Sequence, residues 1–183
     1  MNEGLKRQLV LQVCKKYVGT KESPPNSNNV IFNTRFYGRE VHNGDKPGAS
    51  YAWCGTSVSE IFIEAGFPLG TIDYRRGFAG CPYAVQHVSK WGFEVSFDHA
   101  EAGDVVFFDF DGNGSWDHVG ILKDKNQATK ALEVYEGNTS YTDSKDPVEI
   151  KKANADGGSY LLRPDRKFRD GKVKFIRPKV YLQ

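Results

Sequence analysis

The 183-residue chain has few cysteines, and they stand far apart as Cys14, Cys54 and Cys81. A small, odd number of cysteines argues against the disulfide framework of small secreted domains. None of the three belongs to a CxxC pair, so their spacing does not support a zinc site. The chain is long enough to bury a core of its own, and we expect a single domain over residues 1–183.

The chain also lacks long hydrophobic runs. No stretch of 18 apolar residues is present, so the sequence predicts no transmembrane helix and no membrane insertion. The first ten residues, Met1–Val10, lack the apolar segment of a secretory signal. We therefore expect the protein to be made in a cytoplasm, and if it acts outside, something else must carry or release it.

An excess of charge of one sign is missing too. Lys and Arg number 25 against 23 Asp and Glu, which gives a net charge of +2 and is too balanced to indicate nucleic acid binding. No internal repeat or low-complexity tail is visible. We expect a monomeric globular protein.

What the chain does contain is a thiol at a predicted helix start. Apolar residues recur at helical spacing after Cys54, and Gly66 ends the pattern. Those residues are Val58, Ile61, Phe62 and Ala65. The N–H groups and dipole of a helix N-terminus favour a thiolate, and the backbone N–H of Cys54 would serve as an oxyanion donor.

The periodicity of the chain changes from helical to extended near Gly92. The N-terminal half predicts four helices, and the C-terminal half predicts six strands, which together indicate an α+β fold with helices packed on an antiparallel sheet. The helices are expected over Leu5–Tyr17, Asn29–Tyr37, Cys54–Ala65 and Pro82–Trp91, and the strands over 93–97, 104–110, 118–123, 132–136, 159–162 and 173–176. Residues 20–50 are expected to be largely irregular, and a loop of that length is often functional.

Two polar residues fall on neighbouring predicted strands. If the strands on either side of residues 124–130 pair as a hairpin centred on Gln127, His118 lies directly opposite Glu136, close enough for the carboxylate to hold the imidazole. In this hairpin the numbers of two facing residues sum to 254. Any register in which that sum is even keeps the two side chains on one face. If the strand stays extended through Gly137, Asn138 points to the same face.

Each of these residues also has an ordinary structural interpretation. A buried cysteine at a helix start is usually packing, a histidine that begins a strand is more often structural, and an asparagine after glycine is more often a turn residue. Together, a sulfur nucleophile, an imidazole base and an orienting group are what cysteine-based acyl transfer requires. The other histidines, His42, His87 and His99, have no comparable setting.

At these residues the chain resembles the CHAP family of cysteine- and histidine-dependent amidohydrolases/peptidases. The matching segments run in order over nearly the whole chain. They are Ala52-Trp53-Cys54-Gly55 with Ala65-Gly66, then Ala102-Gly103-Asp104-Val105-Val106-Phe107-Phe108, Asp117-His118-Val119-Gly120-Ile121 and Glu136-Gly137-Asn138-Thr139.

The resemblance implies a papain-like α+β fold and cleavage of bacterial peptidoglycan through a covalent acyl-enzyme. It makes Cys54 the nucleophile, His118 the general base, Glu136 the group that orients His118, and Asn138 a fourth polar member of the site. Gly55 and Thr56 depart from the small or aromatic residues that are more usual after the cysteine. The chain also shows no wall-binding module, which many phage lysins carry.

A calcium loop is a further hypothesis. Asp109, Asp111 and Asn113 supply oxygens at positions 1, 3 and 5 of a calcium-loop pattern, with Gly114 at position 6. Position 12 is Gly120, so the bidentate glutamate is missing. The alternative is an ordinary turn between two strands, and we expect the reaction to require no cofactor.

Two other functions remain open from the sequence. One alternative is a cysteine amidase that acts on a small peptide conjugate. The other is a catalytically silent domain that binds the cell wall or forms part of a virion. Within peptidoglycan, the N-acetylmuramoyl–L-alanine, stem-peptide and cross-bridge amides are all open to the same chemistry. Specificity is expected from residues 20–50 and from aromatic residues near the site, unless these belong to the core; they are Tyr51, Trp53, Tyr83 and Trp116.

Overall fold

The computed structural model describes residues 1–46, 50–73, 77–142, 144–155 and 157–183. Residues 47–49, at the end of the irregular segment expected over 20–50, lie outside the described residues. Among the described residues, no helix is both long and apolar enough to cross a bilayer.

Six strands form one antiparallel sheet within the described residues, in the order β1-β6-β2-β3-β4-β5. The strands are β1 (Gly92–Val95), β2 (Val105–Phe108), β3 (His118–Lys125), β4 (Ala131–Thr139), β5 (Ser159–Lys167) and β6 (Val173–Pro178). The α+β class and the six-stranded antiparallel sheet expected from the sequence are confirmed. The papain-like detail of that expectation stays a prediction.

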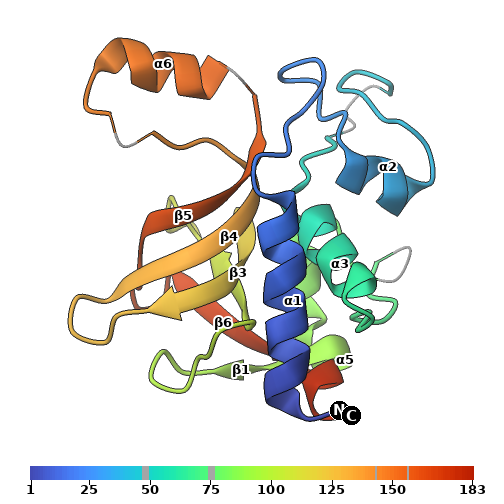
Figure 1. Cartoon of the computed structure of the whole chain (residues 1–183), viewed down its shortest axis with the longest axis vertical. Helices are drawn as coiled ribbons and strands as arrows, with labels where there is room; N and C mark the ends of the chain where they lie inside the picture. Colours follow the sequence, from blue (N-terminus) through green and yellow to red (C-terminus); the bar gives the residue numbers. More distant parts are fainter. Residues whose placement is uncertain (47–49, 74–76, 143, 156) are drawn as a thin grey trace.

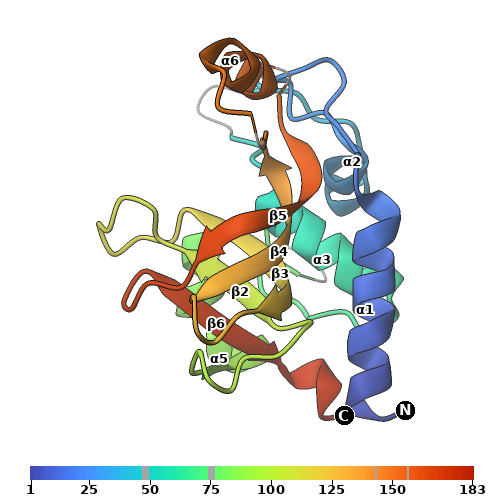
Figure 2. The ribbon, with the colours of Figure 1, turned by 60° about the vertical axis from the view of Figure 1, so that its left-hand side comes forward.

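Helices α1 and α3 lie together against one face of the sheet (Figures 1 and 2). The helices are α1 (Glu3–Tyr17), α2 (Ile31–Tyr37), α3 (Cys54–Glu64), α4 (Cys81–Gln86), α5 (Val88–Trp91) and α6 (Pro147–Ala155), and a 3₁₀ turn spans Lys179–Tyr181. The sequence predicted one helix over Pro82–Trp91, whereas the structure breaks it at His87 into α4 and α5. It did not predict α6, which stands apart from the sheet on the excursion between β4 and β5 (Figure 1).

The sheet buries apolar side chains on both faces, which explains why β2 is apolar without alternation. Val105 and Phe107 pack into the cluster that includes α1 and α3, and Val106 and Phe108 pack into a second cluster on the other face. Strand β2 is therefore held by apolar packing on both of its faces.

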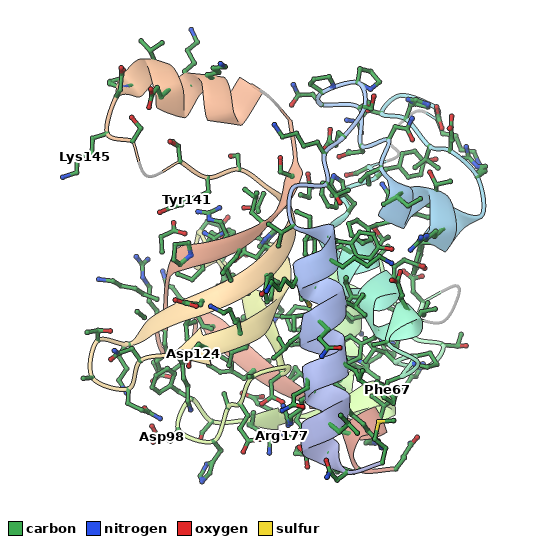
Figure 3. The ribbon with its side chains drawn as sticks, viewed as in Figure 1. Phe67, Asp98, Asp124, Tyr141, Lys145 and Arg177 are labelled. Atoms are coloured by element: carbon green, nitrogen blue, oxygen red, sulfur yellow. The ribbon has the colours of Figure 1, made fainter. Side chains whose placement is uncertain are left out.

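Helix α1 begins with a side-chain cap and is tied to the sheet by ion pairs. Asn2 accepts a hydrogen bond from the Leu5 N–H at 2.9 Å, as N-cap residues do. The buried Asp104 carboxylate accepts from Arg7 at 2.8 Å and from Arg177 at 3.1 and 3.2 Å. Arg177 lies beside the lower part of α1 in Figure 3. These contacts explain why the charged Arg7 is buried, at 6% exposure, whereas Leu5, at which the expected helix began, is 44% exposed.

Helix α3 approaches β4 closely at a glycine. A Cβ added at Gly137 would lie 2.8 Å from both Ser57 Cβ and Trp53 Cε3, closer than real Cβ atoms come to such neighbours. Trp53 directly precedes α3, so the absence of a side chain at Gly137 sets how near the helix start lies to the strand that carries Glu136.

This contact generates a stability prediction. Gly137→Ala is expected to lower the free energy of unfolding by about 1–3 kcal/mol, because the added methyl group overpacks a buried contact. Chemical denaturation measures the change. Gly4→Ala is the matched control: a Cβ there meets only Asn2 Oδ1 at 3.7 Å, and alanine favours the helix, so stability should stay the same or rise slightly. Equal effects of the two variants would contradict the proposed close approach.

Candidate active site

Cys54 is the first residue of α3, as the sequence predicted, and it is 5% exposed. The pKa of the Cys54 thiol is lowered well below its ordinary value. A hydrogen bond with the Cys81 thiol contributes most, burial opposes the shift, and the His118 imidazole and the Gly55 N–H add to the lowering. The local environment therefore favours the thiolate.

His118, the first residue of β3, links Cys54 to Glu136. Its Nε2 lies 2.9 Å from Glu136 Oε2, and Cys54 lies close enough to the imidazole to interact with it electrostatically. Burial lowers the pKa of His118, but the Glu136 carboxylate and Cys54 outweigh burial and raise that pKa to about 9. The thiol pKa is lowered and the imidazole pKa is raised, and both shifts favour a thiolate–imidazolium pair.

The expected hairpin register was wrong by two residues. Gly120, not His118, lies opposite Glu136, because the pairing follows an even sum two higher than expected and shifts at a bulge between Leu122 and Asp124. The new sum is still even, so His118 and Glu136 share a face as predicted. A Cβ at Gly120 would lie 2.8 Å from Glu136 Cγ, so the glycine leaves the space through which the Glu136 side chain reaches His118 diagonally.

Glu136 is fully buried and its carboxylate is held from two sides. Arg166 Nε donates to Oε1 at 2.7 Å and Arg166 Nη2 donates to Oε2 at 2.6 Å, a bidentate pair. Burial raises the pKa of Glu136, but Arg166 and His118 more than offset it and bring that pKa to about 2. Glu136 is therefore an ionised acceptor for the imidazole.

Arg166 is a member of this array that the sequence analysis missed. It belongs to β5, and no motif or regular spacing connects it with Glu136 along the chain. The guanidinium carbon lies 4.8 Å from the centre of the Phe110 ring, and that ring stacks on His118 at 5.8 Å. Phe110 thus covers both the His118 imidazole and the Arg166 guanidinium that binds Glu136.

Asn138 takes a different place from the one expected. Its φ is +55°, in the left-handed region, and the β4–β5 register is irregular between Glu136 and Thr139, so β4 is not regularly extended there. The Asn138 side-chain oxygen lies against Gly158. Within the described part of the chain, no hydrogen bond joins the Asn138 side chain to His118 or Cys54. The structure thus does not join Asn138 to His118 or Cys54, and its part in the site stays a prediction.

The aromatic residues expected near the site divide between core and surface. Trp53 is fully buried and its indole Nε1 donates to Glu22 Oε1 at 2.8 Å, and Tyr51 is also buried. Tyr83 is 41% exposed, and Trp116 is half-buried. Of the four, Tyr83 and Trp116 remain open to contact with a ligand.

The loop expected to hold calcium brings three carboxylates together. Oxygens of Asp109, Asp111 and Asp117 lie within 4.8 Å of one another; Asp117, at position 9 of the pattern, was not predicted. The Asn113 side-chain oxygen, expected as a ligand, accepts from the Ser115 N–H at 2.7 Å. Backbone N–H groups already hold Asp109, from Gly112 at 2.7 Å and Gly114 at 3.0 Å. Hydrogen bonds within the loop account for its shape, and calcium binding stays a prediction.

No protein-family model matches this chain, and no curated protein or solved structure is found to be similar to it.

The thiolate–imidazolium pair predicts how Cys54 reacts with alkylating agents. The rate of reaction with iodoacetamide should remain high near neutral pH in the unaltered protein, because the thiolate is already present. In His118→Ala the pH midpoint of alkylation should rise toward that of an ordinary thiol, since the neighbouring cation is gone. Peptide mass spectrometry follows Cys54 itself. His99→Ala is the control, because His99 is exposed and bonds to Ser96; an unchanged midpoint in His118→Ala would contradict the pair.

The calcium hypothesis has its own measurement. Binding to the carboxylate group predicts that calcium raises the melting temperature above its value in chelator, and that Asp111→Asn removes the increase. Asp98→Asn, which changes an exposed carboxylate on another loop, should leave the increase intact. A melting temperature that is the same in calcium and in chelator would exclude the site.

Proposed function

We propose that the protein is a cysteine-dependent amidohydrolase that cleaves amide bonds of bacterial peptidoglycan. The observation that carries the proposal is the grouping of Cys54, His118 and Glu136: His118 is hydrogen-bonded to Glu136 and interacts electrostatically with Cys54, whose sulfur stands at the start of a helix. A nucleophile, a base and an orienting carboxylate in contact are the groups that covalent acyl transfer needs. Peptidoglycan as the substrate rests on the resemblance to the CHAP family.

The reaction would begin from the thiolate–imidazolium pair. The Cys54 thiolate attacks the amide carbonyl, and the negative charge that develops on the oxygen faces the N–H groups at the start of α3. His118, protonated in this state, donates its proton to the leaving amine as the C–N bond breaks. The product is a thioester on Cys54.

Hydrolysis of the thioester would use the same imidazole as a base. Neutral His118 removes a proton from water, the hydroxide attacks the thioester carbonyl, and the carboxylic acid leaves as the thiolate returns. Glu136 accepts the hydrogen bond from the His118 Nε2–H throughout and stabilises the imidazolium. Arg166 acts through Glu136, so we regard it as a positioning residue.

Wall clearing by variants tests the proposal. Cys54→Ala and His118→Ala are each expected to abolish the clearing of Gram-positive cell walls while the fold survives, because the nucleophile or the proton donor is lost. Glu136→Gln should be less damaging, since the amide oxygen still accepts the imidazole hydrogen bond. A turbidity assay measures clearing, and mass spectrometry of the released fragments identifies which amide was cut.

Controls separate this function from the alternatives. Cys14→Ala and His99→Ala remove a thiol and an imidazole away from the site and should retain clearing. Lysis by a folded Cys54→Ala variant would refute the assignment. Binding to walls without release of new amine would favour a silent wall-binding domain, and release of amine from small peptide conjugates alone would favour the small-substrate amidase.

A further inference from the structure

A second thiol lies beside the proposed nucleophile. Cys81 Sγ is 3.8 Å from Cys54 Sγ, and both residues are buried, at 4% and 5% exposure. Cys81 begins α4 and is 27 residues away along the chain, so the fold and not local sequence makes this pair. In the mechanism proposed above Cys81 supports the Cys54 thiolate through this hydrogen bond but takes part in no bond-making step.

The segment before Cys81 is fixed against α3 by specific contacts. Ser59 Oγ donates to the Phe78 carbonyl at 2.8 Å and accepts from the Phe78 N–H at 2.8 Å. A Cβ at Gly55 would lie 2.7 Å from the Ala79 carbonyl carbon, so the glycine allows the two backbones to touch. The second sulfur is therefore held in place beside the first.

The two thiols differ in character. The pKa of Cys54 is lowered, which favours its thiolate, whereas the hydrogen bond with Cys54, together with burial, raises the pKa of Cys81 well above the ordinary value. Cys14 provides a contrast within the same chain: it is fully buried, and burial raises its pKa to about 12. Oxidation selects thiolates, and of these three buried thiols only Cys54 has its pKa lowered, so Cys54 is the one that an oxidant should attack first.

We propose that Cys54 is a site of oxidation by hydroperoxides and that Cys81 resolves the product into a Cys54–Cys81 disulfide. In the first step the Cys54 thiolate attacks the hydroperoxide, the O–O bond breaks, and Cys54 sulfenic acid and hydroxide (or an alkoxide) form. In the second step the Cys81 sulfur attacks the Cys54 sulfur, the S–O bond breaks, and water leaves with the Cys81 proton. Each step conserves atoms, and the hydroperoxide is the species reduced.

Geometry favours the second step over further oxidation. A disulfide bond is about 2.05 Å long, so the sulfurs need to approach by roughly 1.8 Å. Without a neighbouring thiol, a sulfenic acid proceeds to sulfinic acid, which reductants do not reverse. Cys81 would therefore keep the oxidised nucleophile in a form that a dithiol restores. This consequence for activity rests on the proposed function, whereas the chemistry at the two sulfurs does not.

Intact mass after hydrogen peroxide treatment of the reduced chain tests the site without any activity assay. We expect the loss of two hydrogens, about 2 Da, a linked pair of peptides containing Cys54 and Cys81, and one alkylatable thiol, Cys14, after denaturation. Dithiothreitol should restore the original mass. Cys14→Ala is the matched control and should show the same loss, because it leaves the pair intact.

Removal of Cys81 should change the product. In Cys81→Ser and in Cys81→Ala, each checked for an unchanged fold by its melting temperature, Cys54 is expected to gain two oxygens, about 32 Da, that dithiothreitol does not remove. Sulfinic acid at Cys54 in the unaltered chain at the rate of the variants, or a disulfide that involves Cys14, would overturn the proposal.

A lysis assay on the same samples separates this inference from the proposed function. If both hold, wall clearing disappears as the disulfide forms and returns with dithiothreitol, and in the Cys81 variants any clearing present before oxidation does not return. A reversible disulfide in a protein that clears no wall under reducing conditions would support the thiol pair and refute the wall hydrolase.

Discussion

The buried carboxylate of Glu136 is the constraint on which the rest of the site depends. An ionised carboxylate without partners inside a protein costs several kcal/mol, so it must be paired and hydrogen-bonded. Arg166 binds both oxygens, and His118 takes the remaining direction on Oε2. Because Arg166 keeps Glu136 ionised, Glu136 keeps His118 protonated, and the imidazolium in turn favours the Cys54 thiolate. Beside the Cys81 hydrogen bond, the pKa of Cys54 thus depends on Arg166, which lies on β5, two strands from His118 on β3.

This chain of charges also explains the glycines around it. Glu136 reaches His118 diagonally only because Gly120, which lies opposite it, has no side chain to block the way. Gly137 lets β4 come close to Trp53 and Ser57, and so brings the start of α3 near the strand that holds the carboxylate. The glycines in the motifs around His118 and Glu136 therefore have a steric reason that can be stated atom by atom.

The sequence was informative wherever a signal was local. Helical spacing located α3 and its first residue, and the strand pattern located β3 and β4, which bring His118 and Glu136 to one face. The exact register was not predictable, because the hairpin turns beyond Gln127, where paired residue numbers sum to 257, and the bulge at Leu122–Asp124 then brings the sum to 256. The sequence therefore predicted only that His118 and Glu136 share a face, which any even sum of paired residue numbers gives. The structure was needed to show which residue lies opposite Glu136.

Partners distant in the chain were beyond such reasoning. Arg166 meets Glu136 across β4 and β5, whose register is itself interrupted, and Cys81 meets Cys54 through the packing of the segment around Phe78 on Ser59. Asn138 shows the opposite failure: it lies in the right motif, but a left-handed backbone conformation turns its side chain toward Gly158. Long-range packing and single dihedral angles decided these three cases, and neither leaves a periodic trace in a sequence.

The start of α3 shows how the same architecture leaves room for chemistry. Most helices begin with a Ser, Thr, Asp or Asn whose side chain satisfies one of the free N–H groups. Here Trp53 occupies that place and provides no side-chain cap, and its indole is turned away to the buried Glu22. Trp53 thus fixes the helix start through its hydrogen bond to Glu22 and forms no side-chain hydrogen bond with the N–H groups of the helix. In the proposed reaction these groups have two tasks in turn: the Gly55 N–H supports the thiolate in the resting state, and the Cys54 N–H meets the oxyanion once the carbonyl is attacked. A capping side chain would satisfy the same helix end but would compete with the substrate for it, so the absence of a cap is a structural cost that the proposed function explains.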